Sequence, residues 1–144
     1  MNYRQNRNLD RLHLAAARLY AGLSLSLKRK VGCVIARGTE VLAVGWNQMP
    51  EHFDSNCELQ SGSELLTRPE VLHAEQAALM QIARSQHSSA GATVYVTTAP
   101  CLQCAKLLAA AGIVRVCYAD VYKNNEGLDL LNMLQITTEH IHED

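Results

Sequence analysis

The sequence predicts a single α/β domain, with about five strands in a mixed sheet and helices on both faces. Its 144 residues fall within the usual length of one domain, and its 48% hydrophobic and 19% charged residues are ordinary for a globular protein. In the C-terminal half, strand patterns alternate with helix patterns, which predicts parallel pairing there. No repeat or interdomain linker interrupts the chain, so residues 1–144 form one predicted domain.

The N-terminal half contains one predicted helix and one predicted hairpin. Leucine and alanine residues recur at helical spacing over 9–27, and we expect them to form one buried face. Two β-rich runs, 31–36 and 41–46, flank a short turn that contains Gly38, which predicts a hairpin. Periodicity then disappears over 47–68, which predicts a long loop.

The second half alternates between the two kinds of element. Pro69 predicts the first turn of a helix that fades by Ser85. Strands are expected over 92–98, 113–119 and 136–141, and helices over 102–111 and 127–134.

Composition excludes several classes of protein. The net charge of -1 does not suit a protein that binds long nucleic acids through their phosphates. Residues 1–11 are polar and no apolar run is long enough to span a membrane, so we expect a soluble, cytoplasmic protein without a secretory signal. Its five cysteines are read as metal ligands or buried residues, since a disulfide framework is improbable in that compartment.

Two short motifs carry the chemistry. Cys101 and Cys104 stand three residues apart where a strand gives way to a helix, so both thiolates can bind one zinc ion. His73, at the start of the preceding helix, would be the third ligand. Three protein ligands leave a position for water, which is typical of a catalytic zinc site and not of a structural one.

Glu75 is the predicted proton carrier of this site. The order His-x-Glu followed by Pro-Cys-x-x-Cys matches the signature of zinc nucleobase deaminases, in which the glutamate is not a metal ligand. Either half alone has a simpler interpretation, as a redox pair, half of a structural zinc site or a solvated helix face. Their joint occurrence in this order favours one catalytic Zn²⁺ per chain.

These motifs resemble those of the cytidine and deoxycytidylate deaminase superfamily, and the resemblance extends over about 9–141. It rests on Val31-Gly32-Cys33-Val34-Ile35, Gly45-Trp46-Asn47-Gln48-Met49-Pro50, Val71-Leu72-His73-Ala74-Glu75, Pro100-Cys101-Leu102-Gln103-Cys104-Ala105-Lys106 and the stretch 118–127. It implies a cytidine deaminase-like, three-layer α-β-α fold. The C-terminal stretches resemble the deoxycytidylate branch, which implies hydrolysis of dCMP to dUMP and ammonia by a homo-oligomer, often a hexamer.

The same resemblance suggests substrate contacts. It implies that Asn47 binds the nucleotide, although an asparagine here could also simply cap a turn. We expect Ala74 and Pro100, which flank the metal ligands, to line the substrate site. Lys28, Arg29 and Lys30 are candidates to bind the phosphate, the alternative being a solvated loop.

The chain also departs from the family pattern. Gln48 replaces the second glycine of the family's Gly-Tyr-Asn-Gly loop, and Ala77 replaces a frequent asparagine. In the resembling family, dCTP activates and dTTP inhibits the enzyme, and both would bind with Mg²⁺. Because Gln48 fills space near that loop, we expect weak or absent control of the activity by these triphosphates.

Three alternative functions stay open: deamination of another cytosine nucleotide such as dCTP, a tRNA adenosine deaminase-like activity, and an inactive zinc protein. Lys106 and the overall charge argue against tRNA.

Overall fold

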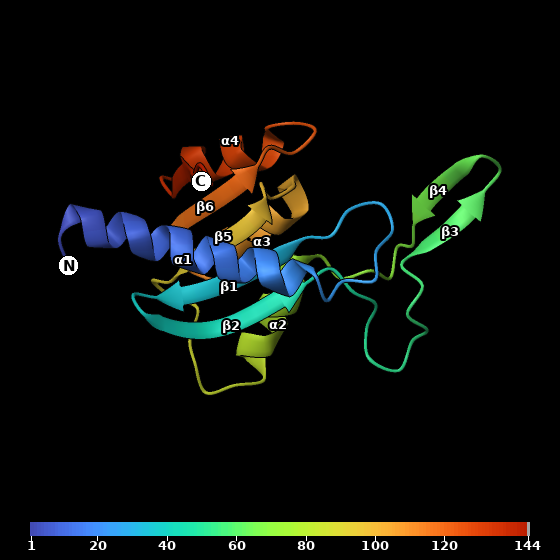
Figure 1. Cartoon of the computed structure of the whole chain (residues 1–144), viewed down its shortest axis with the longest axis horizontal. Coiled ribbons are helices and arrows are strands. Elements are labelled where there is room, and N and C mark those ends of the chain that lie inside the picture. The colour runs from blue at the N-terminus through green and yellow to red at the C-terminus, as the bar shows by residue number, and fades with distance from the viewer. Residues whose placement is uncertain (144) are drawn as a thin grey trace.

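The computed structural model describes residues 1–143, and a five-stranded sheet with the order β2-β1-β5-β6-β7 forms its centre (Figure 1). The strands of this sheet are β1 (Gly32–Arg37), β2 (Glu40–Trp46), β5 (Thr93–Thr98), β6 (Arg115–Asp120) and β7 (Thr137–His140). β1 pairs antiparallel with β2 and β5, whereas β5–β6 and β6–β7 are parallel. The predicted mixed sheet, with its parallel C-terminal half, is therefore confirmed.

Helices cover both faces of this sheet, as predicted. α1 (Tyr3–Ala21) crosses one face, while α2 (Ala74–Ala83), α3 (Leu102–Ala110) and α4 (Glu126–Met133) cover the other (Figure 1). Alternate residues of β1 enter the two resulting cores: Cys33 and Ile35 pack on the side of α2 to α4, and Val34 packs on the side of α1. The result is one three-layer α-β-α domain.

The first helix differs from its prediction in bounds and in orientation. Asn2 and Gln5 form a capping box that starts α1 at Tyr3, and the helix ends at Ala21 and not at 27. Leu12 and Leu19, expected on the buried face, are 63% and 79% exposed.

The buried face of α1 is instead formed by smaller and polar residues: Asp10, His13, Leu14, Ala17 and Ala21. Ala17 packs closely on Gly32 of β1. A Cβ added to Gly32 would overlap the Ala17 carbonyl. Close helix–sheet packing therefore selects the small residues, which a hydrophobicity pattern cannot reveal.

The prediction of one long loop over 47–68 is wrong, because this segment contains a second small sheet. β3 (Glu58–Ser61) and β4 (Glu64–Thr67) pair antiparallel around Gly62, whose φ is +62°, and project away from the main body (Figure 1). Both four-residue strands are mostly exposed on either side, so burial imposes no alternation on their sequence.

The second helix begins later than predicted. Pro69 lies in a turn, and α2 starts at Ala74 after His73 as its N-cap. The intervening chain is extended because the backbone amides of Gln48 and Leu72 donate to each other's carbonyls at 3.0 and 2.8 Å. This pairing places His73 at the start of α2.

Candidate active site and metal centre

The N-termini of α2 and α3 meet beside the central sheet, and each is capped by a candidate metal ligand. His73 is the N-cap of α2, and Cys101 is the N-cap of α3. Two glycines allow neighbouring elements to pack closely against these N-termini, β2 against α2 and α4 against α3. A Cβ on Gly45 of β2 would overlap the Ala74 carbonyl, and a Cβ on Gly127 of α4 would overlap the Pro100 carbonyl.

Three donor atoms converge where these helices begin. Nδ1 of His73 lies 3.2 Å from Sγ of Cys104 and 3.6 Å from Sγ of Cys101, and the three ligand atoms lie within 4.8 Å of one another. The backbone amide of Cys104 donates to Sγ of Cys101 at 3.4 Å, so the helix N-terminus stabilises negative charge on this sulfur. One imidazole and two thiols at this separation are the ligand types of a zinc site, and they fit Zn²⁺.

Electrostatics favour a thiolate in this group even in the protein chain alone. Hydrogen bonds from the Cys104 thiol, His73 and the backbone amide of Cys104 together lower the pKa of Cys101 to about 4. The same sulfur–sulfur pairing, together with burial, raises the pKa of Cys104. Binding of a metal to both sulfurs would therefore release the proton that Cys104 retains.

Glu75 lies one residue into α2 and is only 4% exposed. Burial raises its pKa to about 7, and the negative charge of Cys101 adds to this effect. A carboxyl group with a pKa near neutrality can both accept and donate protons at cellular pH. Glu75 is thus suited to proton transfer beside the three candidate metal ligands.

A pocket of about 210 Å³ opens onto this group. It is lined by residues of four regions: Ser26, Lys28, Arg29 and Val31; Asn47; Thr67, Val71, His73, Ala74 and Glu75; and Thr98, Ala99, Cys101 and Tyr122. Two of the three candidate metal ligands, His73 and Cys101, therefore share one cavity with the buried acid and two cations, while Cys104 lies buried behind it.

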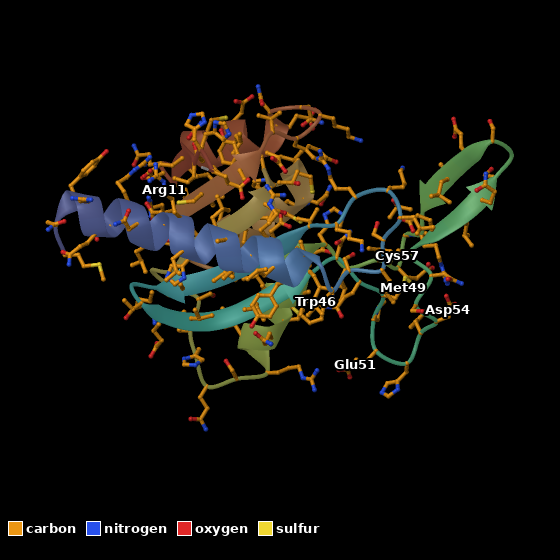
Figure 2. All side chains as sticks on the ribbon, viewed as in Figure 1. Arg11, Trp46, Met49, Glu51, Asp54 and Cys57 are labelled. Carbon is orange, nitrogen blue, oxygen red and sulfur yellow. The ribbon has the colours of Figure 1, made fainter. Side chains whose placement is uncertain are left out.

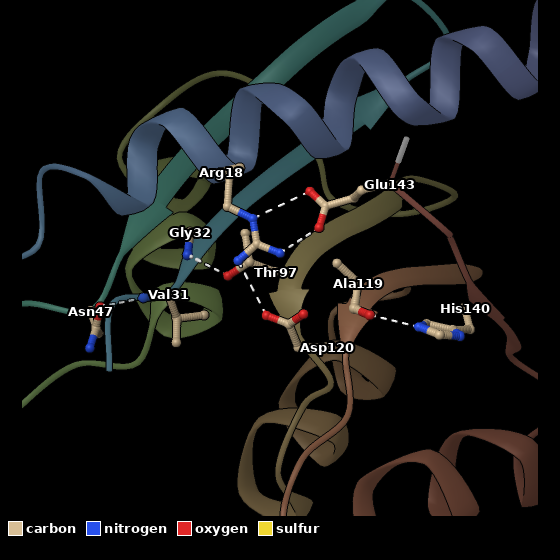
Figure 3. A network of polar contacts seen from close by, with 9 residues as sticks. All are labelled: Arg18, Val31, Gly32, Asn47, Thr97, Ala119, Asp120, His140 and Glu143. Carbon is tan, nitrogen blue, oxygen red and sulfur yellow. Dashed lines mark hydrogen bonds and ion pairs between the residues drawn. The ribbon is translucent and has the colours of Figure 1, made fainter. Parts of the chain in front are cut away.

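Asn47 connects this pocket to the segment that carries the cations. Its Oδ1 accepts from the backbone amide of Val31 at 2.9 Å, and its Nδ2 donates to the carbonyl of Arg29 at 2.7 Å. The next residue after Val31, Gly32, donates its amide to Oγ1 of Thr97 on β5 (Figure 3). Asn47 thus has a structural role, and it also lines the pocket.

The structure brings most of the candidate site residues together. Lys28 and Arg29 line the pocket, but Lys30 and Pro100 are not among the residues of 1–143 that do so. Pro100 is buried directly before Cys101, the N-cap of α3. Sequence reasoning missed Ser26, Thr67 and Tyr122 as lining residues. Tyr122 follows β6 within the stretch 118–127, and its position after a parallel strand was the available signal.

Comparison with known proteins agrees with this geometry. The family model described as the cytidine and deoxycytidylate deaminase zinc-binding region matches residues 7–120. Deoxycytidylate deaminase of Mycobacterium phage D29 is 36% identical over 120 residues, covering 76% of this chain and 92% of that protein. The dCMP deaminase of cyanophage S-TIM5, crystallised in complex with dCMP and dUMP, is 34% identical with a TM-score of 0.87, covering 97% of this chain and 98% of that one.

The relatives include longer proteins. Deoxycytidylate deaminase of Saccharomyces cerevisiae is 36% identical over 123 residues, which are 81% of this chain, but the chain spans only 39% of the length of that relative. It spans 37% of the Schizosaccharomyces pombe enzyme. The family model covers the donor group, Glu75 and most of the pocket. This chain therefore belongs to the cytidine and deoxycytidylate deaminase family of zinc-binding proteins.

Proposed function

We propose that this chain catalyses the hydrolytic deamination of dCMP to dUMP and ammonia, a step of pyrimidine deoxynucleotide metabolism. The observation that carries the proposal is the buried Glu75, which lies in one pocket with His73, Cys101 and the cations of the loop 28–29. The similarity to a dCMP deaminase that was crystallised with dCMP and dUMP supports this choice of substrate.

The chain's own residues account for the proton transfers of this reaction. Zinc, held by His73, Cys101 and Cys104, would supply a Lewis acid that makes water nucleophilic near neutral pH. Glu75 accepts a proton from the water that attacks C4 of cytosine and passes a proton to ring N3. It then delivers the other water proton to the amine, the C4–N bond breaks, and ammonia leaves.

The other pocket residues would bind the nucleotide. Lys28 and Arg29 would provide positive charge for the 5′-phosphate, and Asn47, whose bonds to the same loop hold it in the pocket wall, would contact the sugar or base. Ala74 lies in the first turn of α2, where backbone amides lack intrahelical partners and can donate to a ligand. Pro100 would act indirectly, through the conformation of the ligand turn.

We further propose one zinc ion per chain and assembly into a homo-oligomer such as a hexamer. The five unpaired cysteines, two of them candidate ligands, suit a reducing compartment, so we place the enzyme in the cytoplasm. Within residues 1–143, every helix is too short or too polar to span a membrane.

Weak regulation by dCTP and dTTP with Mg²⁺ stays a proposal. Gln48 occupies the position of the family's glycine, its backbone is paired with Leu72, and it lines two surface pockets beside Trp46. A side chain there reduces the space for a phosphate to approach the backbone. Titration of both triphosphates against dCMP turnover tests this; strong inhibition by micromolar dTTP would contradict it.

A deamination screen over dCMP, CMP, dCTP, deoxycytidine and a tRNA substrate tests the proposed function. We expect dCMP to have the highest kcat/KM, with ammonia and dUMP formed in equal amounts. Preference for dCTP would move the proposal to another cytosine nucleotide, and activity on tRNA alone would replace it with nucleic-acid editing.

A further inference from the structure

The carboxylate of Glu58 is buried at the base of the β3–β4 hairpin, outside the catalytic group. Glu58 is 8% exposed, and Figure 2 labels its neighbour Cys57 where the hairpin leaves the main body. The carboxylate accepts from the Ser26 hydroxyl at 2.7 Å and from the backbone amides of Leu27 and Lys28 at 3.1 and 3.2 Å. All of these donors belong to one segment, the loop 24–30.

This loop forms part of the wall of the substrate pocket. Ser26, Lys28 and Arg29 line the pocket directly. Glu58 holds the middle of the loop, at residues 26–28. Asn47 holds its two ends, because it accepts from the Ser24 hydroxyl at 2.8 Å and donates to the Arg29 carbonyl at 2.7 Å. The backbone of each cation is therefore bonded to one of these two residues, Lys28 to Glu58 and Arg29 to Asn47.

The loop needs such an anchor because of its charge. Three consecutive cations, at 28–30, repel one another, and the side chains of all three are exposed. Although burial opposes its ionisation, hydrogen bonds from Ser26 and the two amides and the charge of Lys28 hold the pKa of Glu58 below its usual range. An ionised acceptor makes stronger hydrogen bonds than a neutral one.

The opposite strand of the hairpin also contacts the pocket. Thr67 on β4 pairs with Glu58 in the register of the hairpin and is a lining residue. The base of the hairpin thus contributes one wall of the cavity and fixes a second one through Glu58. The hairpin contributes to the substrate pocket although most of it projects away from the main sheet (Figure 1).

We propose that Glu58 is a positioning residue that holds Lys28 and Arg29 where the phosphate of the substrate binds. The inference rests on the proposed function, because it assigns the phosphate to these two cations. Glu58 then affects KM for a phosphorylated substrate, with little effect on the chemistry at Glu75 or on substrates without phosphate.

Kinetics of Glu58→Ala and Glu58→Gln, with Glu64→Ala as the control, test this positioning role. Glu64 is exposed at the tip of the same hairpin. For Glu58→Ala we expect KM for dCMP to rise about tenfold, with kcat within about threefold, since hydrogen bonds to a charged group are lost. The kcat/KM for deoxycytidine and the zinc content should stay near wild type. Glu58→Gln keeps an oxygen acceptor and should lie between wild type and Glu58→Ala.

Trypsin gives a readout of the loop that does not depend on turnover, because it cleaves after Lys and Arg in mobile segments. We expect cleavage at 28–30 to be about tenfold faster in Glu58→Ala than in wild type or Glu64→Ala. An unchanged KM for dCMP, an equal loss with deoxycytidine, or unchanged cleavage would each overturn the inference. A wild-type protein that does not deaminate dCMP would overturn the proposed function itself.

Discussion

His73 and Cys104 are 31 positions apart in the sequence, yet Nδ1 of the first lies 3.2 Å from Sγ of the second. The contact exists because α2 and α3 begin side by side behind the sheet, each with a donor at its N-cap or first turn. A donor group assembled from two helix N-termini depends on both helices, so it can be tested through the ligands and through the packing that brings the helices together.

Loss of one ligand should release the metal. We expect Cys101→Ala to retain less than about a tenth of the zinc of wild type, because even groups that only support a ligand change metal affinity 10–100-fold. Metal analysis of the purified protein measures this. Cys117→Ala, which removes a buried thiol on the α1 side of the sheet, serves as the control and should keep its zinc. Full zinc occupancy in Cys101→Ala would refute the assignment of this ligand.

Close packing at Gly45 should control the position of α2. A Cβ at this position meets the backbone of both Ala74 and Ala78, so Gly45→Ala must displace the helix that carries Glu75. We expect destabilisation by about 1–3 kcal/mol and a loss of turnover larger than that of a control, Gly22→Ala, at the end of α1. Urea unfolding measures the loss of stability, and dCMP kinetics measure the loss of turnover. Unaltered turnover in Gly45→Ala would show that the site tolerates displacement of α2.

A partly buried ion pair joins α1 to β6 on the opposite face, with Asp10 buried and Arg115 24% exposed. Arg115 donates two hydrogen bonds to Asp10 at 2.7 and 2.8 Å, and the Tyr95 hydroxyl donates a third at 2.8 Å. We expect Asp10→Ala to lower the free energy of unfolding by about 1–3 kcal/mol, because three hydrogen bonds lose their acceptor while Arg115 keeps its ion pair with Glu139 at 3.0 Å. The exposed pair of Arg84 and Glu51, at 3.7 Å, is the comparison; Arg84→Ala should cost less than about 1 kcal/mol.

The same ion pair predicts how stability depends on pH. Burial favours the neutral form of Asp10, but hydrogen bonds from Arg115 and Tyr95 and the charge of Arg115 outweigh it and lower its pKa. As the pH falls, the unfolded state, with an aspartate pKa of about 4, takes up the proton first. The stabilisation is therefore complete above about pH 5 and is lost as the pH falls through the folded pKa.

Urea unfolding of wild type and Asp10→Asn from pH 7 to pH 3 measures this effect. We expect the difference in stability between the two proteins to shrink toward pH 3. A difference that stays constant over this range would show that Asp10 does not titrate with a lowered pKa.

Much of the site could be predicted because its residues lie in short local motifs. The spacing of Cys101 and Cys104 already places two sulfurs on one turn, and the strand–helix alternation predicts that the ligand helices lie on the same sheet. Predictions failed where contacts between distant segments determine where an element begins. Pro69 has the form of a helix start, but pairing of Gln48 with Leu72 keeps the chain extended up to His73.

The role of Glu58 was beyond the reach of sequence reasoning for a related reason. Its partners, Ser26 to Lys28, are about thirty residues away in the sequence, and the hairpin that presents it has no buried face to impose a pattern. Likewise, α1 exposes the apolar Leu19 and buries the charged Asp10, which is the opposite of what their hydrophobicity predicts. Asp10 can be buried because it forms an ion pair with Arg115 of β6.

The variant Glu75→Gln tests the central claim most directly, because it keeps the shape of the side chain and removes its ability to carry protons. Turnover of dCMP and zinc content are measured on the same preparation. We expect a zinc content near one ion per chain. We expect turnover to fall by about 10²–10⁴-fold relative to wild type. Near wild-type turnover with normal zinc would contradict the assignment of Glu75 as the proton carrier, and with it the proposed mechanism.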